Sequence, residues 1–299
     1  MAVTEQAIMG ALQSVIDPNT GKDFVSSKCI KGFKVEGGRV AFTLELGYPA
    51  QSQHQAFAEA LAAAGVRVAI FDVNEAGGQA VAEAIGGVFC KVDITSEESV
   101  VEGYARARAA HGQERIVVHC AVVSGGGKTI SFDKEARVYK RNPTEMIARS
   151  AEGIFTASYR IASHGALGMA NSDPLNDDGE RGVIILTSSA ASQDGQIGQV
   201  AYGGGKGAVN SMVLPMARDL MDLGIRVNAI VPGIFATPPM LAVKDRAPAI
   251  FAGLAASVPF PKRLGHPPEF GSLVLELARN GYFNGQCIRL DGAIRMPPR

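Results

Sequence analysis

The residues best suited to chemistry lie in the second half of the chain, where Tyr202 and Lys206 are separated by three glycines. On a helix, residues four apart lie on one face, one turn from each other. A neighbouring ammonium favours phenolate and lowers the pKa of a tyrosine, which is about 10 in a free side chain. A tyrosine tuned in this way can remove the proton from an alcohol or return it to a ketone. The pair therefore predicts acid–base chemistry at a carbon–oxygen bond.

Ser189 lies thirteen residues before Tyr202 and follows the apolar segment 182–187. That segment is typical of a buried strand, and open α/β sheets bind their ligands at the carboxyl ends of the strands. We therefore expect the Ser189 hydroxyl to hold the substrate oxygen. The alternative is a surface pair on a helix with an unrelated serine, and the segments that flank these residues favour the active site.

The elements that would position these residues alternate between strand and helix. Strands are expected at 39–46, 66–71, 88–92, 116–123, 182–187, 225–230 and 286–290, and helices at 52–64, 76–85, 96–111, 144–163, 202–223 and 268–280. Segment 164–181 is polar and indicates a surface excursion. This alternation predicts a doubly wound, Rossmann-like α/β domain over residues 39–299, with a parallel sheet covered on both faces.

Residues 1–38 predict an N-terminal extension made of a helix and a hairpin. An apolar stripe over 3–16 indicates the helix, and the alternating segments 31–35 and 39–46 around Gly37 and Gly38 indicate the hairpin. Residues 39–46 would then also have to serve as the first strand of the parallel sheet.

Composition limits the partners. The chain has 299 residues with 29 basic and 29 acidic side chains, which argues against nucleic acid and a charged membrane surface. Its four cysteines form no metal or redox motif, and no metal site is expected. Reduced thiols and an N-terminus without a leader pattern predict a cytoplasmic protein. No apolar run reaches the roughly 20 residues needed to span a bilayer.

Longer segments around the site carry a resemblance to a known family. They read GQIGQVAY at 195–202, VPFPKRLG at 258–265 and NGQCIRLDGA at 284–293. Together with Ser189, Tyr202 and Lys206, they resemble the short-chain dehydrogenase/reductase family, most of all its type II 3-hydroxyacyl-CoA dehydrogenases, over about residues 56–299. The resemblance implies an NAD-dependent enzyme that interconverts a secondary alcohol and a ketone in a small-molecule substrate such as an acyl-CoA. It also implies a homo-oligomer paired through the helices at 144–163 and 202–223.

The same resemblance assigns residues to the two ligands. Ser189, Tyr202 and Lys206 would be catalytic, with Lys206 also holding the nicotinamide ribose. Asp72 would bind the adenosine ribose and repel a 2′-phosphate, which favours NAD over NADP. Asp93 stays open between a cofactor contact and a helix cap. The other implied contacts are Val92, Ala121, Pro232, Ile234 and Thr237 for the cofactor, and Gln196 for the substrate.

Three features depart from the family pattern. Segment 47–54 reads GYPAQSQH where the family has a glycine-rich turn for pyrophosphate, and Ser150 stands in place of a catalytic asparagine. Residues up to about 57 resemble the small domain of iron–sulfur cluster assembly factors, with Gln51 at the position of that family's cysteine. The altered turn supports a second hypothesis, a catalytically impaired scaffold that keeps the fold but binds NAD poorly.

Overall fold

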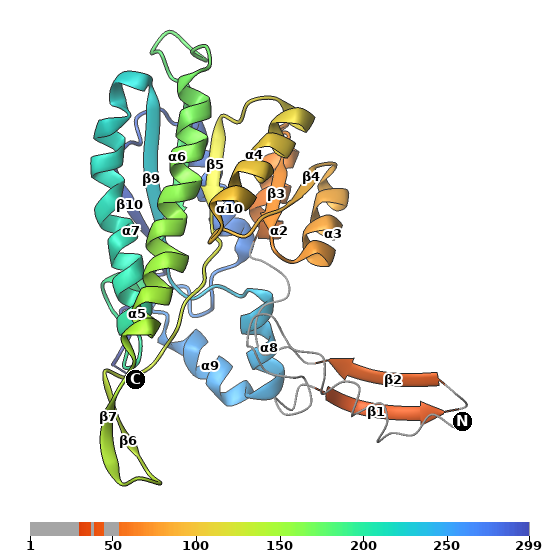
Figure 1. The fold of residues 1–299 in the computed structure, drawn as a ribbon, viewed down its shortest axis with the longest axis vertical. Helices are drawn as coiled ribbons and strands as arrows, with labels where there is room; N and C mark the ends of the chain where they lie inside the picture. Colours follow the sequence, from red (N-terminus) through yellow and green to blue (C-terminus); the bar gives the residue numbers. More distant parts are fainter. Residues whose placement is uncertain (1–29, 37–38, 45–53, 299) are drawn as a thin grey trace. The chain divides into compact units, whose positions relative to one another are not determined.

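The computed structural model describes residues 30–36, 39–44 and 54–298, and the chain divides into two compact units, 1–50 and 51–299. In the first unit, β1 (Ile30–Glu36) pairs with β2 (Arg39–Leu44) as an antiparallel hairpin (Figure 1). The hairpin of the extension is thereby confirmed. The helix expected at 3–16 and most of the altered turn at 47–54 lie outside the described residues.

The expectation that residues 39–46 form the first strand of the parallel sheet is not met. Within the described residues, β2 pairs with β1 alone, in a two-stranded sheet of its own. A connection of two residues, Gly37 and Gly38, brings these two segments together at a small loss of loop entropy. Local pairing is therefore favoured over pairing with a strand that lies far away in the sequence.

The second unit contains the predicted parallel strands. Four of them form one sheet in the order β10 (Cys287–Leu290), β9 (Ile225–Pro232), β8 (Gly182–Thr187) and β5 (Ile116–His119). The remaining two, β3 (Ala69–Asp72) and β4 (Val88–Lys91), form a separate parallel pair. Every residue of β8 is buried, as expected of a strand covered on both faces. The predicted α/β class is confirmed.

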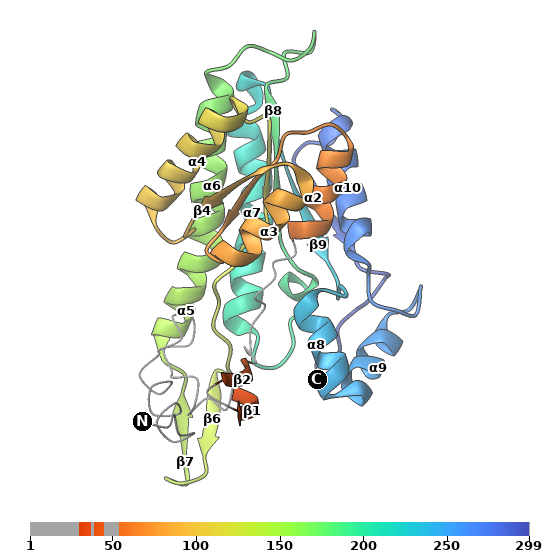
Figure 2. The same cartoon turned by 90° about the vertical axis from the view of Figure 1, so that its right-hand side faces the viewer.

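Helices cover both faces of this sheet (Figures 1 and 2). One face packs on α4 (Glu97–His111), α6 (Ala157–Ala170) and α7 (Val200–Asp219), with Ile184 and Leu186 of β8 in the same core. The other face packs on α2 (His54–Ala63), α3 (Glu75–Ile85) and α10 (Pro267–Arg279), with Val183 and Ile185 in that core. Successive side chains of β8 thus pack alternately into two cores, one on each face of the sheet.

The long helix after β5 extends further than expected. It begins as α5 (Thr144–Ser150), passes through one π-helical segment (Ala151–Thr156) and continues as α6 to Ala170. Residues 164–170 are therefore helical and only the segment after them is a surface excursion. Small residues such as Gly165 and Ala166 let this end of α6 approach the sheet, and Gly165 is so close to Val117 that a Cβ would collide with it.

Two further features escaped the sequence pattern. An exposed hairpin, β6 (Ile130–Asp133) with β7 (Val138–Arg141), follows the glycine run at 125–127. The proline-rich segment after β9 folds into α8 (Pro238–Arg246) and α9 (Pro248–Ser257), each with proline in its first turn, where its missing N–H is tolerated. Among the described residues, no helix is both long enough and apolar enough to cross a bilayer.

Candidate active site

The expected site residues follow the carboxyl ends of neighbouring parallel strands. β5, β8 and β9 are in register, with His119 beside Leu186 and Thr187 beside Ile230. Ala121 follows β5, Ser189 follows β8, and Ile234 follows β9. Because parallel strands end at one edge of a sheet, this arrangement gathers residues that lie far apart in the sequence.

Ser189 begins a short turn of 3₁₀ helix at Ala190–Ser192 and is half-buried. Its Oγ accepts a 3.1 Å hydrogen bond from the Ala191 N–H, and its carbonyl oxygen accepts one of 2.6 Å from the Ser192 hydroxyl. The hydroxyl also hydrogen-bonds the Tyr202 side chain. The structure therefore brings together the serine and tyrosine that the sequence predicted.

Tyr202 lies in the first turn of α7 and is largely buried. Burial raises its pKa above the ordinary value, and the hydrogen bond with Ser189 offsets part of that rise. The phenol is thus protonated at neutral pH. In this form Tyr202 can donate a proton to a ketone oxygen, whereas accepting one from an alcohol requires a higher pH.

Lys206 lies one turn further along α7 and is almost fully buried. Its Nζ donates a 2.6 Å hydrogen bond to the Thr187 carbonyl oxygen, and its own carbonyl accepts one of 2.9 Å from the Ser188 hydroxyl. Burial lowers the pKa of Lys206 to about 8, and the nearby Cys120 thiol acts in the opposite direction. The amine is therefore poised to lose its proton close to physiological pH.

The expectation that Lys206 lowers the pKa of Tyr202 is not met in this structure. The groups that act on Tyr202 are its own burial and Ser189, and the Lys206 amine is directed to Thr187 instead. Burial also favours the uncharged amine, which attracts a phenolate less than an ammonium does. The residues occupy the expected places, but their electrostatic relation differs.

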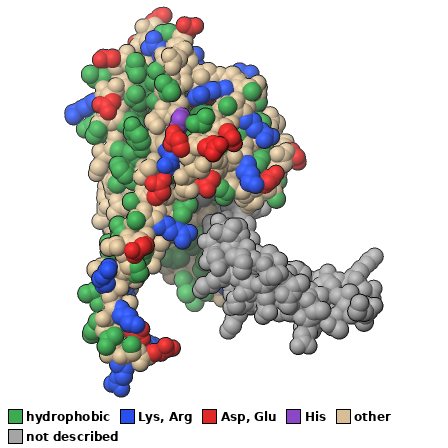
Figure 3. Space-filling model, in the orientation of Figure 1, with side chains coloured by type: hydrophobic (Ala, Val, Ile, Leu, Met, Phe, Trp, Pro, Cys, Tyr) green, Lys and Arg blue, Asp and Glu red, His purple; other side chains and the backbone are tan. Residues whose placement is uncertain are grey.

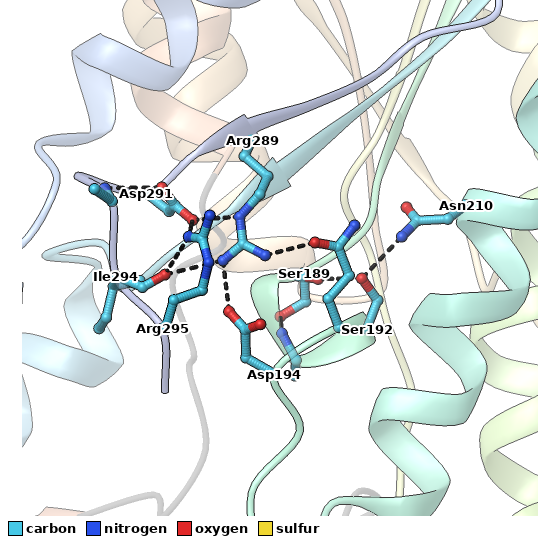
Figure 4. Close-up of polar contacts among 11 residues, drawn as sticks. Ser189, Ser192, Asp194, Asn210, Arg289, Asp291, Ile294 and Arg295 are labelled. Atoms are coloured by element: carbon cyan, nitrogen blue, oxygen red, sulfur yellow. Dashed lines mark hydrogen bonds and ion pairs between the residues drawn. The ribbon is translucent and has the colours of Figure 1, made fainter. Parts of the chain in front are cut away.

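A network of polar contacts from the C-terminal strand holds the loop that carries Ser189 (Figure 4). The Arg289 guanidinium contacts Asp194 at 2.6 Å and the Gln193 side-chain oxygen at 2.6 Å, both in this loop. It also binds Asp291 at 2.6 Å and the Ile294 carbonyl oxygen at 3.0 Å. One side chain thus ties the loop after β8 to the turn after β10. The sequence contained Arg289 within a family segment but no signal of this contact.

Gln196, the expected substrate residue, lies further along the same loop. Its Nε2 donates a 3.0 Å hydrogen bond to the Pro297 carbonyl oxygen, and the Ile197 N–H donates one of 3.0 Å to Pro298. Segment 297–298 therefore holds the part of the loop around Gln196, while Arg289 holds the part at Gln193 and Asp194.

The residues expected at the adenosine end differ in their surroundings. Asp72 ends β3, is half-buried, and accepts a 2.9 Å hydrogen bond from the Asn74 N–H. Asp93 is exposed and accepts two hydrogen bonds from Thr95, at 2.8 Å from the N–H and 2.7 Å from the hydroxyl. The N-cap of α4 is Ser96, so Asp93 does not cap the helix and instead closes the turn that precedes it. Val92 is buried in the core, and its N–H donates a 3.1 Å hydrogen bond to the Asp72 carbonyl oxygen.

Of the residues expected along the nicotinamide, Pro232, Ile234 and Thr237 lie in one segment at the end of β9, and Ala121 follows β5. Pro232 ends β9, and the Ile234 carbonyl oxygen accepts a 3.0 Å hydrogen bond from the Gly265 N–H. Thr237 is buried and precedes α8. Ala121 is half-buried beside Cys120, whose thiol lies 3.1 Å from the Thr187 hydroxyl. The segment after β9 therefore starts at the sheet edge to which the Lys206 amine is directed.

Ser150, at the position of the family's asparagine, has a structural role that the sequence did not reveal. Its buried hydroxyl accepts a 3.0 Å hydrogen bond from the Gly125 N–H and lies 3.1 Å from the Ser124 hydroxyl. It is the last residue before the π-helical segment. Ser150 therefore anchors the loop that follows β5 to the long helix at the edge of the site.

The described residues offer polar groups of the kind that would hold the two riboses of a dinucleotide: the Asp72 carboxylate, which closes β3, and the buried Lys206 amine of α7. The part of the chain that would meet the pyrophosphate, residues 47–53, lies outside the described residues.

Comparison with known proteins agrees with this geometry. A family model described as enoyl-(acyl carrier protein) reductase matches residues 50–294. A second model, for an iron–sulfur cluster assembly protein, matches residues 5–76, so the two overlap over α2 and β3. The expected N-terminal resemblance is confirmed and extends beyond residue 57.

Individual relatives align over most of the chain. The 3-hydroxyacyl-CoA dehydrogenase type-2 of Drosophila melanogaster is 39% identical over 82% of this chain and 93% of its own. The human protein of the same name is 38% identical over 81% of this chain and 91% of its own. A crystal structure of 3-hydroxyacyl-CoA dehydrogenase type-2 from Mycobacterium avium superposes with a TM-score of 0.76 at 33% identity, covering 84% of this chain and 94% of that one. With these matches and a serine, tyrosine and lysine gathered at one sheet edge, the chain belongs to the short-chain dehydrogenase/reductase family of oxidoreductases.

Proposed function

We propose that the protein is an NAD-dependent dehydrogenase that interconverts a secondary alcohol and a ketone in a 3-hydroxyacyl-CoA-like substrate. The observation that carries this proposal is the hydrogen bond between Ser189 and Tyr202 at the carboxyl edge of the sheet, with Lys206 buried one helical turn behind. An alcohol oxygen placed between the two hydroxyls would exchange its proton with Tyr202 while Ser189 orients it. Bound NAD supplies the hydride acceptor at nicotinamide C4.

The cofactor preference rests on Asp72. Its carboxylate at the end of β3 would accept hydrogen bonds from both hydroxyls of an adenosine ribose. A 2′-phosphate at the same place would meet a negative charge. We therefore propose NAD rather than NADP.

The acyl-CoA substrate is proposed from the relatives named for it, which align over more than four-fifths of this chain.

We further propose a homo-oligomer. Apolar side chains remain exposed along the π-helical segment, α6 and α7, among them Phe155, Tyr159, Leu167 and Leu214. Figure 3 shows hydrophobic side chains scattered over the side of the molecule that α6 and α7 form. The free thiols of Cys90, Cys120 and Cys287 suit the cytoplasm, where thiols stay reduced.

The direct test is reduction of a short-chain 3-ketoacyl-CoA with NADH, followed by NADH absorbance. The purified protein should turn over, and Tyr202→Phe should be slower by about 10²–10⁴-fold, because positioned acid–base groups contribute about this much. Tyr282→Phe is the matched control, since this tyrosine is fully exposed. Equal rates for Tyr202→Phe and the native protein would refute the role of Tyr202.

The rival function is a scaffold that has lost NAD, and it is favoured by the sequence GYPAQSQH at 47–54. Pro49 lacks an N–H, and lost hydrogen bonds to a charged group weaken binding by about 1.5–3 kcal/mol each. We expect NAD binding in the high micromolar range or weaker, roughly. The test is calorimetric titration of NAD into the native protein and into a variant with a glycine-rich turn at 47–54. The variant should bind NAD more tightly than the native protein. Tight native binding that the repair does not improve would show that this turn accepts phosphate as it stands.

A further inference from the structure

The α7 helix carries a third polar side chain in line with Tyr202 and Lys206. Asn210 lies four residues after Lys206, so the three side chains form one stripe along the helix, each one turn from the next. The site described above uses the first two. The third points to the turn that follows Ser189 (Figure 4).

Two hydrogen bonds in series connect Asn210 to Ser189. The Asn210 Nδ2 donates a 2.8 Å hydrogen bond to the Ser192 hydroxyl, and that hydroxyl donates one of 2.6 Å to the Ser189 carbonyl oxygen. We call this arrangement the Asn210–Ser192 bridge. Through it, the main chain of Ser189 is held from α7, the helix that also carries Tyr202.

The Ser192 hydroxyl fixes the order of donors in the Asn210–Ser192 bridge. A hydroxyl has one proton to donate. Because this proton goes to the Ser189 carbonyl oxygen, the hydroxyl oxygen has to accept its second bond from a donor. An amide N–H is such a donor, whereas a carboxylate or an aliphatic side chain of the same size is not. The bridge therefore requires the amide of Asn210.

The other end of this amide supports the same conclusion. The Oδ1 of Asn210 is buried and receives no hydrogen bond from any residue that the structure describes. A buried polar atom without a partner lowers stability, and an apolar side chain of similar shape would avoid this cost. Asparagine is thus unfavourable here at one atom, and its favourable contribution is the bond that holds Ser192.

We propose that Asn210 is a positioning residue of the active site, which fixes the main chain of Ser189 through Ser192. The Ser189 hydroxyl is thereby kept where it hydrogen-bonds Tyr202. This inference rests on the proposed dehydrogenase function. Arg289 holds a later part of the same loop from the C-terminal strand. Asn210 instead acts on Ser189 itself, from the helix that carries the proton-transfer group.

The first test compares Asn210→Leu with the native protein in 3-ketoacyl-CoA reduction. Leucine has about the size of asparagine but donates no hydrogen bond. We expect kcat to fall about fivefold with little change in KM, because one hydrogen bond that orients a reacting group is lost. Ser211→Ala is the matched control, since this exposed hydroxyl bonds the Gly207 carbonyl oxygen within α7. An unchanged kcat in a folded Asn210→Leu overturns the proposal.

The pH profile of alcohol oxidation separates positioning from a purely structural role. The hydrogen bond with Ser189 holds the pKa of Tyr202 below the value that burial alone would give it. When that bond is loosened, the pKa of Tyr202 rises further, so oxidation by Asn210→Leu should accelerate only at higher pH. The substitution changes no charge, and Lys206 and the ion pair of Asp194 are kept. A lower melting temperature with an unshifted profile overturns the proposal.

A double-mutant cycle tests the route through Ser192. If Asn210 acts only through this hydroxyl, adding Asn210→Leu to Ser192→Ala should lower kcat no further than Ser192→Ala does alone. Reductions that multiply in the double variant would mean that the two side chains act separately. That result would overturn the Asn210–Ser192 bridge as the means of positioning.

Hydrogen–deuterium exchange tests the bridge without turnover. The amides of residues 192–194 donate to the carbonyl oxygens of residues 189–190. These amides should exchange faster in Asn210→Leu than in the native protein or in Ser211→Ala. Equal exchange in all three proteins overturns the proposal. A native protein without turnover would instead refute the proposed function, and the exchange rates would still show whether Asn210 holds the turn.

Discussion

The Lys206 side chain donates a 2.6 Å hydrogen bond to the Thr187 carbonyl oxygen, so the last residue of β8 fixes the amine of α7. Ser189 follows two residues later, and its hydroxyl bonds Tyr202 on the same helix. One strand end therefore positions all three side chains of the site. All three side chains are largely or partly buried at this strand end, and burial is the main cause of the shifted pKa values of Tyr202 and Lys206.

Lys206 should make the stability of the protein depend on pH. Its pKa is about 8 in the folded protein against 10.5 in the unfolded chain. Between these values the folded state has released the proton that the unfolded state still holds, so the free energy of unfolding rises with pH. Relative to Lys206→Met, the native protein should gain about 2 kcal/mol between pH 7.5 and 10. Urea denaturation of both proteins across this range measures the difference, and parallel curves would contradict the lowered pKa.

Tyr202 should give the two directions of the reaction opposite responses to pH. Burial raises its pKa, so the phenol stays protonated through neutral pH. Ketone reduction uses this proton and should hold its rate up to the pKa, whereas alcohol oxidation needs the phenolate and should accelerate as pH rises. Initial rates in both directions, with cofactor saturating, measure this. An oxidation rate that is flat from pH 7 to 10 would argue that another group takes the proton.

Asp72 should determine the choice between NAD and NADP. Asp72→Asn keeps an acceptor for the Asn74 N–H while removing the charge. We expect the preference for NAD to fall by about tenfold, because repulsion of the 2′-phosphate is lost. Asp93→Asn, at an exposed carboxylate bound by Thr95, should leave the preference unchanged. Competition binding of NAD and NADP to each variant measures the preference. If only Asp93→Asn changed the preference, Asp93 and not Asp72 would be the residue that contacts the cofactor.

Arg289 should act on the reaction through the loop it holds. Arg289→Met removes the contacts to Asp194 and Gln193, while Arg295→Met removes a longer, exposed contact to Asp291. We expect the first to reduce kcat by about tenfold, since Ser189 loses its fixed position, and the second to have little effect. Thermal denaturation of each variant separates this from unfolding. Unchanged kcat in a folded Arg289→Met would show that the loop keeps its geometry without the guanidinium.

The sequence predicted what depends on local pattern and on family segments. The buried run at 182–187 matches the bounds of β8. A central parallel strand is apolar on both faces, so its ends are marked clearly where the apolar run stops. The site residues Ser189, Tyr202 and Lys206 were found through spacing and flanking segments. Their roles and the domain limits remain predictions.

What the sequence missed depends on distance and burial. The direction of the pKa shift at Tyr202 follows from how deeply α7 packs, which spacing along a helix does not encode. The contact between Arg289 and Asp194 spans ninety-five residues and lacks any periodic signal. Residues 39–46 alternate as a strand should, but the pattern does not choose between two partners, and the neighbouring β1 is the nearer one.

The bracing of the Ser189 loop by Arg289 has a consequence for synthesis of the protein. On the ribosome, β8, the loop after it and α7 emerge well before β10, so the loop lacks its guanidinium partner during that interval. The elements that bear Ser189, Tyr202 and Lys206 can pack first, and the final geometry of the loop is set only once β10 has joined β9. A nascent chain halted after α10 would therefore contain Ser189, Tyr202 and Lys206, but the loop that carries Ser189 would still lack its contacts with Arg289.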